Sequence, residues 1–412
     1  MGLTRRQFGA SAAAAVVAPL AAAAPHTVAL AARTAATAPA PDPRQAAERA
    51  IAAYNAMQAQ YYQPGAHLYH ERIPVQPGDN PYSYVWPFSQ ATRATLDMLG
   101  LPGVGGRYAP DVADRAQALA AYYNPSPQSH NPASPPAAPS PPAYASYVMP
   151  PLGGGGDAFY DDNEWVGLDG LQQHLMTGDA AALARATTVS NLVDYGWDTT
   201  SSDPDPGGTF WTQASWSHDR NTISNGPGAE VQTRLYLLTK DPHYLSGAQR
   251  QFAWVTQHLL APNGLFWDHV SINGSVEHTQ WSYNQGVMLG AAGLLYRATG
   301  NPGYLAQARA IATHALTFYS QAGRIFTSDV IFDAIFFRNL LLLDSIDRDD
   351  DRYRAVLQAM SGYTDALWQA VDPSSGLVGV QPYNPIDLNV QAGFTQLNAL
   401  LAWSRDAYHL IA

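Results

Sequence analysis

Two adjacent acidic residues, Asp161 and Asp162, lie between aromatic residues and follow the glycine run 153–156. Adjacent Cα atoms are about 3.8 Å apart, and side chains that leave a non-helical turn can diverge further. Carboxyl groups about 5–5.5 Å apart serve retaining glycosidases as nucleophile and acid/base, whereas inversion needs a wider gap that admits a water. An acidic pair at a helix start can also simply complement the helix dipole. The pair therefore permits double-displacement chemistry at a sugar.

Other chemistries have weaker support in the sequence. The chain has no cysteine, so thiolate nucleophiles, thiolate zinc sites and disulfides are excluded. The 12 histidines form no His-Glu-x-x-His motif, and we expect no metal and no cofactor. The run Ser217-His218-Asp219 resembles part of a hydrolytic triad, but neighbours in sequence cannot supply its converging geometry.

Neutral polar and aromatic residues gather in six segments that each lead into an apolar run: 82–88, 159–165, 220–227, 280–286, 328–333 and 385–391. Sugars need this mixture, because aromatic faces cover their C–H patches while amides and hydroxyls bond their OH groups. The candidate substrate-binding residues in and near these segments are Trp86, Tyr160, Trp165, Trp211, Asn221, Ser224, Asn225, Tyr283, Asn284, Gln285, Phe332, Asp333 and Arg338.

Helices must position these segments, and a repeated sequence motif indicates where these helices begin and end. Variants of Thr-Gly-Asp begin at Thr177, Thr239 and Thr299, at spacings of 62 and 60 residues. Each variant ends one apolar run and begins another, since Asp or Asn next to Pro supplies an N-cap and a first-turn proline. The repeating unit is therefore a helical hairpin of about 60 residues, and the chain has room for six.

The helices fall into two classes. Six amphipathic segments carry most of the charge: 43–61, 109–123, 179–195, 242–260, 302–319 and 350–370. Six others are apolar or small almost all round: 84–99, 162–176, 226–239, 283–298, 330–346 and 390–405. A helix that is apolar on every side is a buried one. The sequence therefore predicts an (α/α)6 toroid, in which the six polar segments meet at the end where the inner helices begin.

One segment interrupts the hairpins. Residues 124–151 contain ten prolines and cannot pack a core. A domain linker is one interpretation, but we prefer a long loop inserted before the second inner helix, because six hairpins need both sides in one ring. Residues 41–412 then form a single catalytic domain.

The motifs Tyr160–Trp165, Asn221–Pro227, Tyr283–Gly286 and Phe336–Leu340 resemble glycoside hydrolase family 76, the endo-α-1,6-mannanases with an (α/α)6 barrel. The resemblance covers nearly the whole chain after the leader. It implies that Asp161 is the nucleophile and Asp162 the acid/base, with retention of configuration and no metal.

The chain departs from the family pattern at Asp333. Where the family typically has Phe-Lys-Gly-Ile-Phe, this chain has Phe-Asp-Ala-Ile-Phe from Phe332. We expect Asp333 to lie at the mouth of the ring and accept hydrogen bonds from substrate hydroxyls, or to form an ion pair with a partner such as Arg338, because an unpaired buried carboxylate is costly.

Composition limits the partners and the location. With 22 basic and 33 acidic residues the net charge is -11, which disfavours nucleic acid and anionic lipid surfaces. Residues Thr4–Phe8 form a twin-arginine motif before an Ala-rich stretch, so we expect 1–40 to be a signal peptide and leader, and the protein to be secreted by that pathway. No later apolar run approaches the roughly 20 residues of a spanning helix. We expect a monomer without membrane insertion.

Three functions remain open from the sequence. The first is a secreted retaining endohydrolase of α-1,6-linked mannose backbones, such as fungal mannan or actinobacterial lipomannan. The second is a cell-wall mannan transglycosylase, which shares the nucleophilic step but transfers the glycosyl group to a sugar. The third is a glycan-binding toroid without turnover, which the presence of both aspartates disfavours.

Overall fold

The computed structural model describes residues 41–131, 139–379 and 385–412, and these described residues belong to one compact unit. The predicted leader, residues 1–40, lies outside the described residues. None of the described helices has the length and apolar character needed to cross a membrane.

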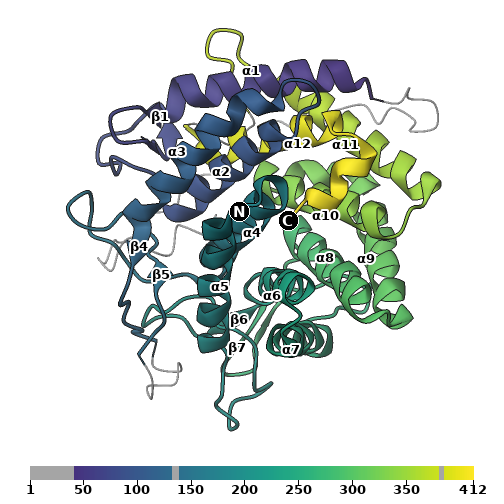
Figure 1. The fold of residues 1–412 in the computed structure, drawn as a ribbon. Helices are drawn as coiled ribbons and strands as arrows, with labels where there is room; N and C mark the ends of the chain where they lie inside the picture. The colour runs from purple at the N-terminus through teal and green to yellow at the C-terminus, as the bar shows by residue number, and fades with distance from the viewer. Residues whose placement is uncertain (1–40, 132–138, 380–384) are drawn as a thin grey trace, which may run out of the picture. The chain divides into compact units, whose positions relative to one another are not determined.

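Twelve α-helices of this unit alternate between an inner and an outer ring (Figure 1). The inner helices are α2 (Val85–Leu99), α4 (Tyr160–Thr177), α6 (Gly226–Thr239), α8 (Ser282–Thr299), α10 (Val330–Ile346) and α12 (Leu388–Ala402). The outer helices are α1 (Pro43–Tyr61), α3 (Ala109–Ala118), α5 (Ala180–Tyr195), α7 (Pro242–His258), α9 (Pro302–Ser320) and α11 (Asp350–Gln369). Each inner helix contacts the next, and α12 contacts α2, so the ring closes. The predicted (α/α)6 toroid is confirmed.

Burial separates the two rings as their composition predicts. In α10, residues 330–344 are buried without interruption, whereas α9 buries only Ala308, Ile311, Ala312, Ala315 and Tyr319. Small residues let the inner helices approach closely. A Cβ added at Gly286 of α8 would lie 2.8 Å from the Cα of Phe336 in α10, a separation that real Cβ atoms do not tolerate.

The repeated Thr-Gly-Asp motif forms the turns from α4, α6 and α8 to the outer helices that follow them. Gly178 ends α4 in the left-handed conformation (φ 74°), and Gly300 ends α8 in the same way (φ 71°). The Asp179 carboxylate then accepts a hydrogen bond from the Ala181 amide and caps α5. Asp241 and Asn301 cap α7 and α9 in the same way. We call the end of the ring where the inner helices begin the N-terminal face. These turns lie at the opposite end.

Short strands connect segments at the N-terminal face. The three-stranded sheet β6 (Asp219–Asn221), β7 (His269–Ser271) and β8 (Val276–Glu277) is antiparallel, and β3 (Arg72–Ile73) pairs with β9 (Ile386–Asp387). The pair β1 (Tyr62–Gln63) and β2 (Leu68–Tyr69) follows α1. In the proline-rich insertion, β4 (Tyr123–Asn124) pairs with β5 (Ala143–Tyr144), which closes the base of the loop before α4. Residues 132–138 of this insertion lie outside the described residues.

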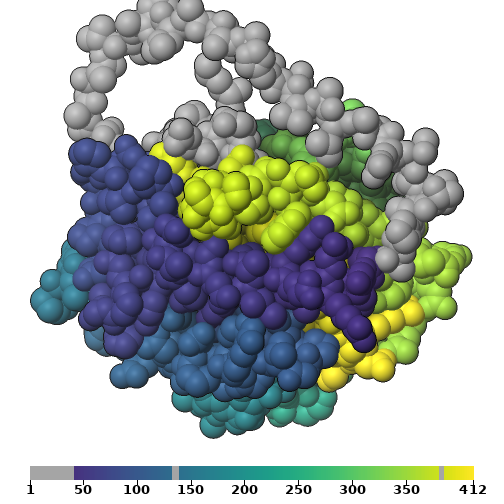
Figure 2. Space-filling model, turned by 90° about the horizontal axis from the view of Figure 1, so that it is seen from above, coloured from purple at the N-terminus to yellow at the C-terminus, as the bar shows by residue number. Residues whose placement is uncertain are grey.

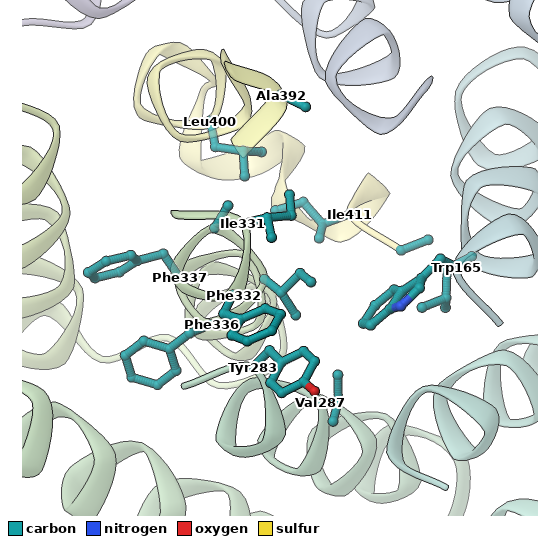
Figure 3. Packing of buried hydrophobic residues seen from close by; sticks show 14 of the residues in the cluster. Trp165, Tyr283, Val287, Ile331, Phe332, Phe336, Phe337, Ala392, Leu400 and Ile411 are labelled. Carbon is teal, nitrogen blue, oxygen red and sulfur yellow. The ribbon is translucent and has the colours of Figure 1, made fainter. Parts of the chain in front are cut away.

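The first and last outer helices lie side by side, as the purple and yellow-green segments in Figure 2 show. Arg49 of α1 forms an ion pair with Asp365 of α11, and its guanidinium lies 5.1 Å from the ring centroid of Trp368. Inside the ring, apolar side chains from α4, α8, α10 and α12 converge on the central space (Figure 3).

Candidate active site

The two aspartates lie in the first turn of α4, at the N-terminal face. Asp161 is fully buried and Asp162 is 8% exposed. The indole Nε1 of Trp211 donates to Asp161 Oδ2 at 3.4 Å, and the Tyr160 amide donates to the Trp211 carbonyl at 2.9 Å. The residues that the sequence predicts as the catalytic pair therefore meet Trp211, which precedes the next inner helix in the chain.

The segment that carries Trp211 is held by a buried arginine. The Arg220 guanidinium is completely buried and donates to Asp198 Oδ2 at 2.6 Å. It also donates to the carbonyls of Pro204, Asp205 and Ser271. A charged group with this many partners fixes the loop between α5 and α6 in one conformation, since a buried charge needs pairing.

An aromatic cluster adjoins the aspartates. The Trp211 ring lies 5.3 Å from Phe159 and 5.6 Å from Trp216, measured between centroids. Trp216 is 42% exposed, which is unusual for a large aromatic side chain. Trp216 was not predicted from the sequence, although its place five residues after Trp211 was a usable signal. The cluster offers a ring face to an apolar sugar surface.

A second aromatic group lies across the ring, around Phe332 of α10. Tyr283 of α8 stacks on Phe332 with ring centroids 3.9 Å apart, and Trp86 of α2 lies 6.0 Å from it. Figure 3 shows Phe332, Tyr283 and Trp165 directed toward the central space. Trp165 lies one helical turn after Asp161, and its indole Nε1 has no hydrogen-bond partner among the described residues. These four predicted residues are brought together inside the ring.

Several predicted amides serve the fold. The Gln285 side chain accepts from the Phe266 amide at 2.7 Å and donates to the Phe266 and Trp281 carbonyls, both at 3.0 Å. Asn225 accepts from the Thr209 amide at 2.9 Å and donates to the Thr209 and Asn221 carbonyls. Both side chains bind the preceding loop, and their contact with substrate stays a prediction.

Gln285 is the fourth residue of α8, a position that has a similar role in other inner helices, whereas Asn225 is the residue immediately before α6. The Asn163 side chain in α4 accepts from the Tyr144 amide and donates to the Tyr144 carbonyl. The Gln391 side chain in α12 accepts from the Val378 amide. The second and third residues of the same turns include Asp161, Asp162, Trp86 and Tyr283. In these helices the side chain at the fourth position bonds the backbone of a neighbouring loop. The residues at the second and third positions include the candidate catalytic and aromatic residues.

Asp333 also occupies the fourth position, in α10, and this corrects its predicted place at the mouth of the ring. It is fully buried, and its Oδ1 accepts from Ser282 Oγ at 2.7 Å. Tyr363, on outer helix α11, lies close enough to interact electrostatically with this carboxyl. Burial raises the pKa of Asp333 well above its ordinary value. Arg338 forms its ion pair with Asp97 and not with Asp333.

Arg338 lies deeper in the ring and is also corrected. Its guanidinium donates to Asp97 Oδ2, to Gln172 Oε1 at 3.0 Å and to Gln396 Oε1 at 3.4 Å. All four side chains are buried. Arg338 therefore joins α2, α4, α10 and α12 through buried contacts.

Tyr160 is a third correction. Its side chain is fully buried in a separate cluster with Ala143, Leu192 and Phe210, outside the inner ring. A Cβ added at Gly196 would lie 2.4 Å from the Tyr160 ring, which shows how tightly the end of α5 packs on it. Tyr160 therefore anchors the start of α4 and leaves the site to its two neighbours.

Several oxygens at the N-terminal face have no hydrogen-bond partner among the described residues. They are Asn221 Oδ1, Ser224 Oγ, Asn284 Oδ1 and Asn389 Oδ1. The first three were predicted from sequence. Asn389 was missed, although it is the second residue of α12 and so corresponds to Asp161 in α4. Buried polar atoms are normally satisfied, so these four are groups that a bound ligand could engage.

Asp268 was also missed. It accepts from Asn284 Nδ2 at 3.3 Å and pairs with His269 at 2.9 Å. The hydrogen bond and charge of Asp268 raise the pKa of His269 despite its burial. Among the described residues, no group of three His, Asp or Glu side chains is placed to hold a metal ion.

The sequence model of glycosyl hydrolase family 76 matches residues 45–374. A mannan endo-1,6-alpha-mannosidase of Candida glabrata is 30% identical over 143 residues, which cover 32% of this chain and 31% of the relative. A putative mannan endo-1,6-alpha-mannosidase of Schizosaccharomyces pombe is 28% identical over 221 residues, which cover 50% of this chain and 47% of the relative. The chain thus matches less than half of each relative's length.

Solved structures share the fold. A family 76 mannosidase from Bacteroides thetaiotaomicron has a TM-score of 0.72 at 23% identity, over 87% of this chain and 98% of that one. An inactive variant of the Salegentibacter α-1,6-mannanase was solved with α-1,6-mannotriose bound, and two consecutive aspartates in it are replaced by asparagine. Its TM-score is 0.69 at 20% identity, over 87% of this chain and 99% of that one.

Proposed function

This chain belongs to glycosyl hydrolase family 76, and on that premise we propose that it hydrolyses α-1,6-linked mannose backbones from within the chain, with retention of configuration. One observation carries the proposal: two consecutive aspartates begin the second inner helix at the N-terminal face, beside the indole of Trp211. The relatives with this family assignment act on mannan, and replacement of two consecutive aspartates accompanies inactivity in the Salegentibacter enzyme.

In the proposed reaction the Asp161 carboxylate attacks the anomeric carbon while Asp162 gives its proton to the departing O6 oxygen. A glycosyl ester forms on Asp161, and the chain portion with the new hydroxyl leaves. Water then attacks the same carbon, Asp162 accepts its proton, and the Asp161 ester bond breaks. Two inversions at one carbon retain its configuration. The Trp211 N–H, at 3.4 Å from Asp161 Oδ2, orients the nucleophile.

The surroundings suit a neutral sugar. Aromatic faces come from Trp216 on one side and from Trp86 and Tyr283 on the other. Oxygens of Asn221, Ser224, Asn284 and Asn389 supply hydrogen-bond acceptors that the described residues leave unused. Mannose has hydroxyls for these acceptors and C–H patches for the rings.

The test is to incubate the protein with a linear α-1,6-mannan in H₂¹⁸O and resolve the products by mass. Endohydrolysis predicts shorter oligosaccharides from the earliest times, with one ¹⁸O at each reducing end that a cut creates. A redistribution to longer chains without label would instead identify transfer to a sugar. Release of mannose alone would contradict an internal cut, and no change in the polymer would contradict the proposal as a whole.

We also propose that the protein is exported by the twin-arginine pathway and acts as a monomer. The support for export is the Arg5-Arg6 pair before an Ala-rich stretch. Replacing both arginines by lysine should keep the protein inside the cell, whereas continued export would contradict the assignment. Sedimentation velocity tests the monomer.

A further inference from the structure

A pocket lies at the N-terminal face, between the starts of α8 and α10. It has a volume of about 380 Å³, within the range of roughly 300–1,000 Å³ that small-ligand sites occupy. Three short segments form it: residues 278–281 before α8, the end of α9, and the turn η4 (Gln321–Thr327) that leads to α10. We call it the rim pocket.

The walls of the rim pocket combine aromatic and neutral polar groups. Trp281 and Phe318 are half-buried, so each offers part of its ring to the pocket. Thr279, Thr327 and Ser328 add hydroxyls. This is the mixture that a hexopyranose ring requires, with apolar faces for its C–H surface and hydrogen-bonding groups for its edge.

Arg324 supplies the charge of the pocket. Its guanidinium lies 4.3 Å from the Phe318 ring centroid and donates to the Phe318 carbonyl at 3.3 Å and to Gln321 Oε1 at 3.1 Å. Within the described ranges Arg324 forms no ion pair, and no Asp or Glu lines the pocket. The nearby Glu277 carboxylate accepts from Thr279 Oγ1 at 2.7 Å. An arginine has five N–H donors, so Arg324 retains donors for a ligand.

The backbone holds these groups in place. Ala322 (φ 51°) and Gly323 (φ 69°) both adopt the left-handed conformation, which reverses the chain after α9 and returns Arg324 over Phe318. The Tyr319 hydroxyl donates to the Gln280 carbonyl at 2.8 Å and ties the segment 278–281 to the end of α9. A left-handed alanine is strained, and such strain persists only where the surrounding structure imposes it.

The rim pocket is continuous with the aromatic groups of the candidate active site. The Trp281 ring, which lines the pocket, lies 5.7 Å from Phe332, and Phe332 stacks on Tyr283. Helix α10 is three inner helices from α4, so it lies across the ring from the aspartates (Figure 1). A polysaccharide that crosses the N-terminal face from α4 toward α8 and α10 would reach this pocket.

We propose that the rim pocket is an accessory subsite that binds one hexopyranose ring of the mannan away from the cleaved bond, with Arg324 bonding its oxygens; this inference rests on the proposed function. The bound ring belongs either to the backbone or to a side branch, and the two sources share the same chemistry. The subsite would make cleavage depend on chain length in the first case and on branching in the second.

The test compares Arg324→Ala and Thr327→Trp with the wild type. The first variant removes the charged donor, and the second fills the pocket from an exposed position. Arg348→Ala is the matched control, because it removes an arginine from the opposite end of the ring, where Arg348 pairs with Asp406. Substrates are linear α-1,6-mannooligosaccharides from trisaccharide to octasaccharide, and a branched mannan with its debranched form.

A charged hydrogen bond contributes about 1.5–3 kcal/mol, so on substrates that reach the rim pocket we expect kcat/KM to fall at least tenfold through KM in both variants. The trisaccharide should be cleaved as by the wild type. A deficit that begins at a certain linear length identifies a backbone residue, and a deficit only on the branched mannan identifies a side branch. Wild-type kcat/KM of both variants on every substrate would overturn the subsite while leaving the proposed function intact. A wild type that cleaves no α-1,6-mannan would overturn both.

Discussion

Replacing Arg338 by methionine separates a structural role from a role in substrate binding. The Arg338 guanidinium bonds Asp97, Gln172 and Gln396, and all of these side chains are buried. Methionine fills much of the same volume but cannot donate. Asp97 would then keep the bond from Gln172 Nε2 at 2.8 Å and lose its ion pair.

The expected magnitude follows from the burial of the pair. Burial raises the pKa of Asp97 and lowers that of Arg338, while the attraction between them opposes both shifts. Removing one partner of such a buried pair costs about 3–5 kcal/mol, because the other charge stays desolvated. The entropy of unfolding is about 2.1 cal/mol/K per residue, so for roughly 370 residues 1 kcal/mol corresponds to about 1.3 °C. The melting temperature should fall by about 4–6 °C.

Thermal unfolding followed by circular dichroism measures this change, and mannan kinetics below the transition measure the other role. We expect KM within twofold of the wild type. Adding Asp97→Asn should recover part of the lost stability, since it removes the unpaired charge and the oxygen of the new amide can still accept from Gln172. If Arg338→Met melts like the wild type but raises KM, the guanidinium serves the substrate and our account of the buried network is wrong.

Three other predictions concern Glu230, Asp333 and Trp211. Burial raises the pKa of Glu230 in α6 to about 8, so the contribution of this group to stability is fully present below about pH 4.5 and is lost as the pH rises toward 8. Across this range the free energy of unfolding of the wild type should fall relative to that of Glu230→Gln by up to about 1.4 kcal/mol per pH unit. Parallel pH profiles of the two proteins would contradict this prediction. Asp333→Asn should keep the bond from Ser282 and leave KM unchanged, whereas Asp333→Ala should cost about 1–3 kcal/mol in chemical denaturation; a changed KM in the Asn variant would return Asp333 to the active site. Trp211→Phe should lower kcat about three- to tenfold with little change in stability, because it removes the donor to Asp161 while keeping the aromatic cluster; wild-type kcat would show that this N–H does not orient the nucleophile.

The helices could be predicted from sequence because their signals are local. The Asp179 cap and the left-handed Gly178 mark a helix boundary within a few residues, and α10 is apolar on every side. The aspartate pair was also a local signal, since both residues share one turn of α4. Such features need no knowledge of what packs against them.

The amides could not be assigned in the same way, because their roles depend on partners distant in sequence. Asn284 and Gln285 are neighbours, yet Gln285 clasps Phe266 while Asn284 Oδ1 has no partner among the described residues. The difference is the direction of consecutive side chains on one helix, roughly 100° apart. Asp333 was misplaced for the same reason, since its partners Ser282 and Tyr363 come from two other helices. Gln285 and Asp333 share the fourth position of their helices with Asn163 of α4 and Gln391 of α12, whereas Asn284 is the third residue of α8.

The most direct test of the central claim is the rate at which Asp161→Asn and Asp162→Asn cleave an unactivated α-1,6-mannan. Both substitutions are nearly isosteric, and general acid/base assistance is worth roughly 10²–10⁴-fold, with at least as much for the nucleophile. We expect each variant to fold and to lose at least about 100-fold in kcat/KM, while the control Asp241→Asn, where asparagine caps α7 equally well, keeps wild-type activity. A folded variant of either aspartate that retains more than about a tenth of wild-type activity would contradict the assignment of the pair.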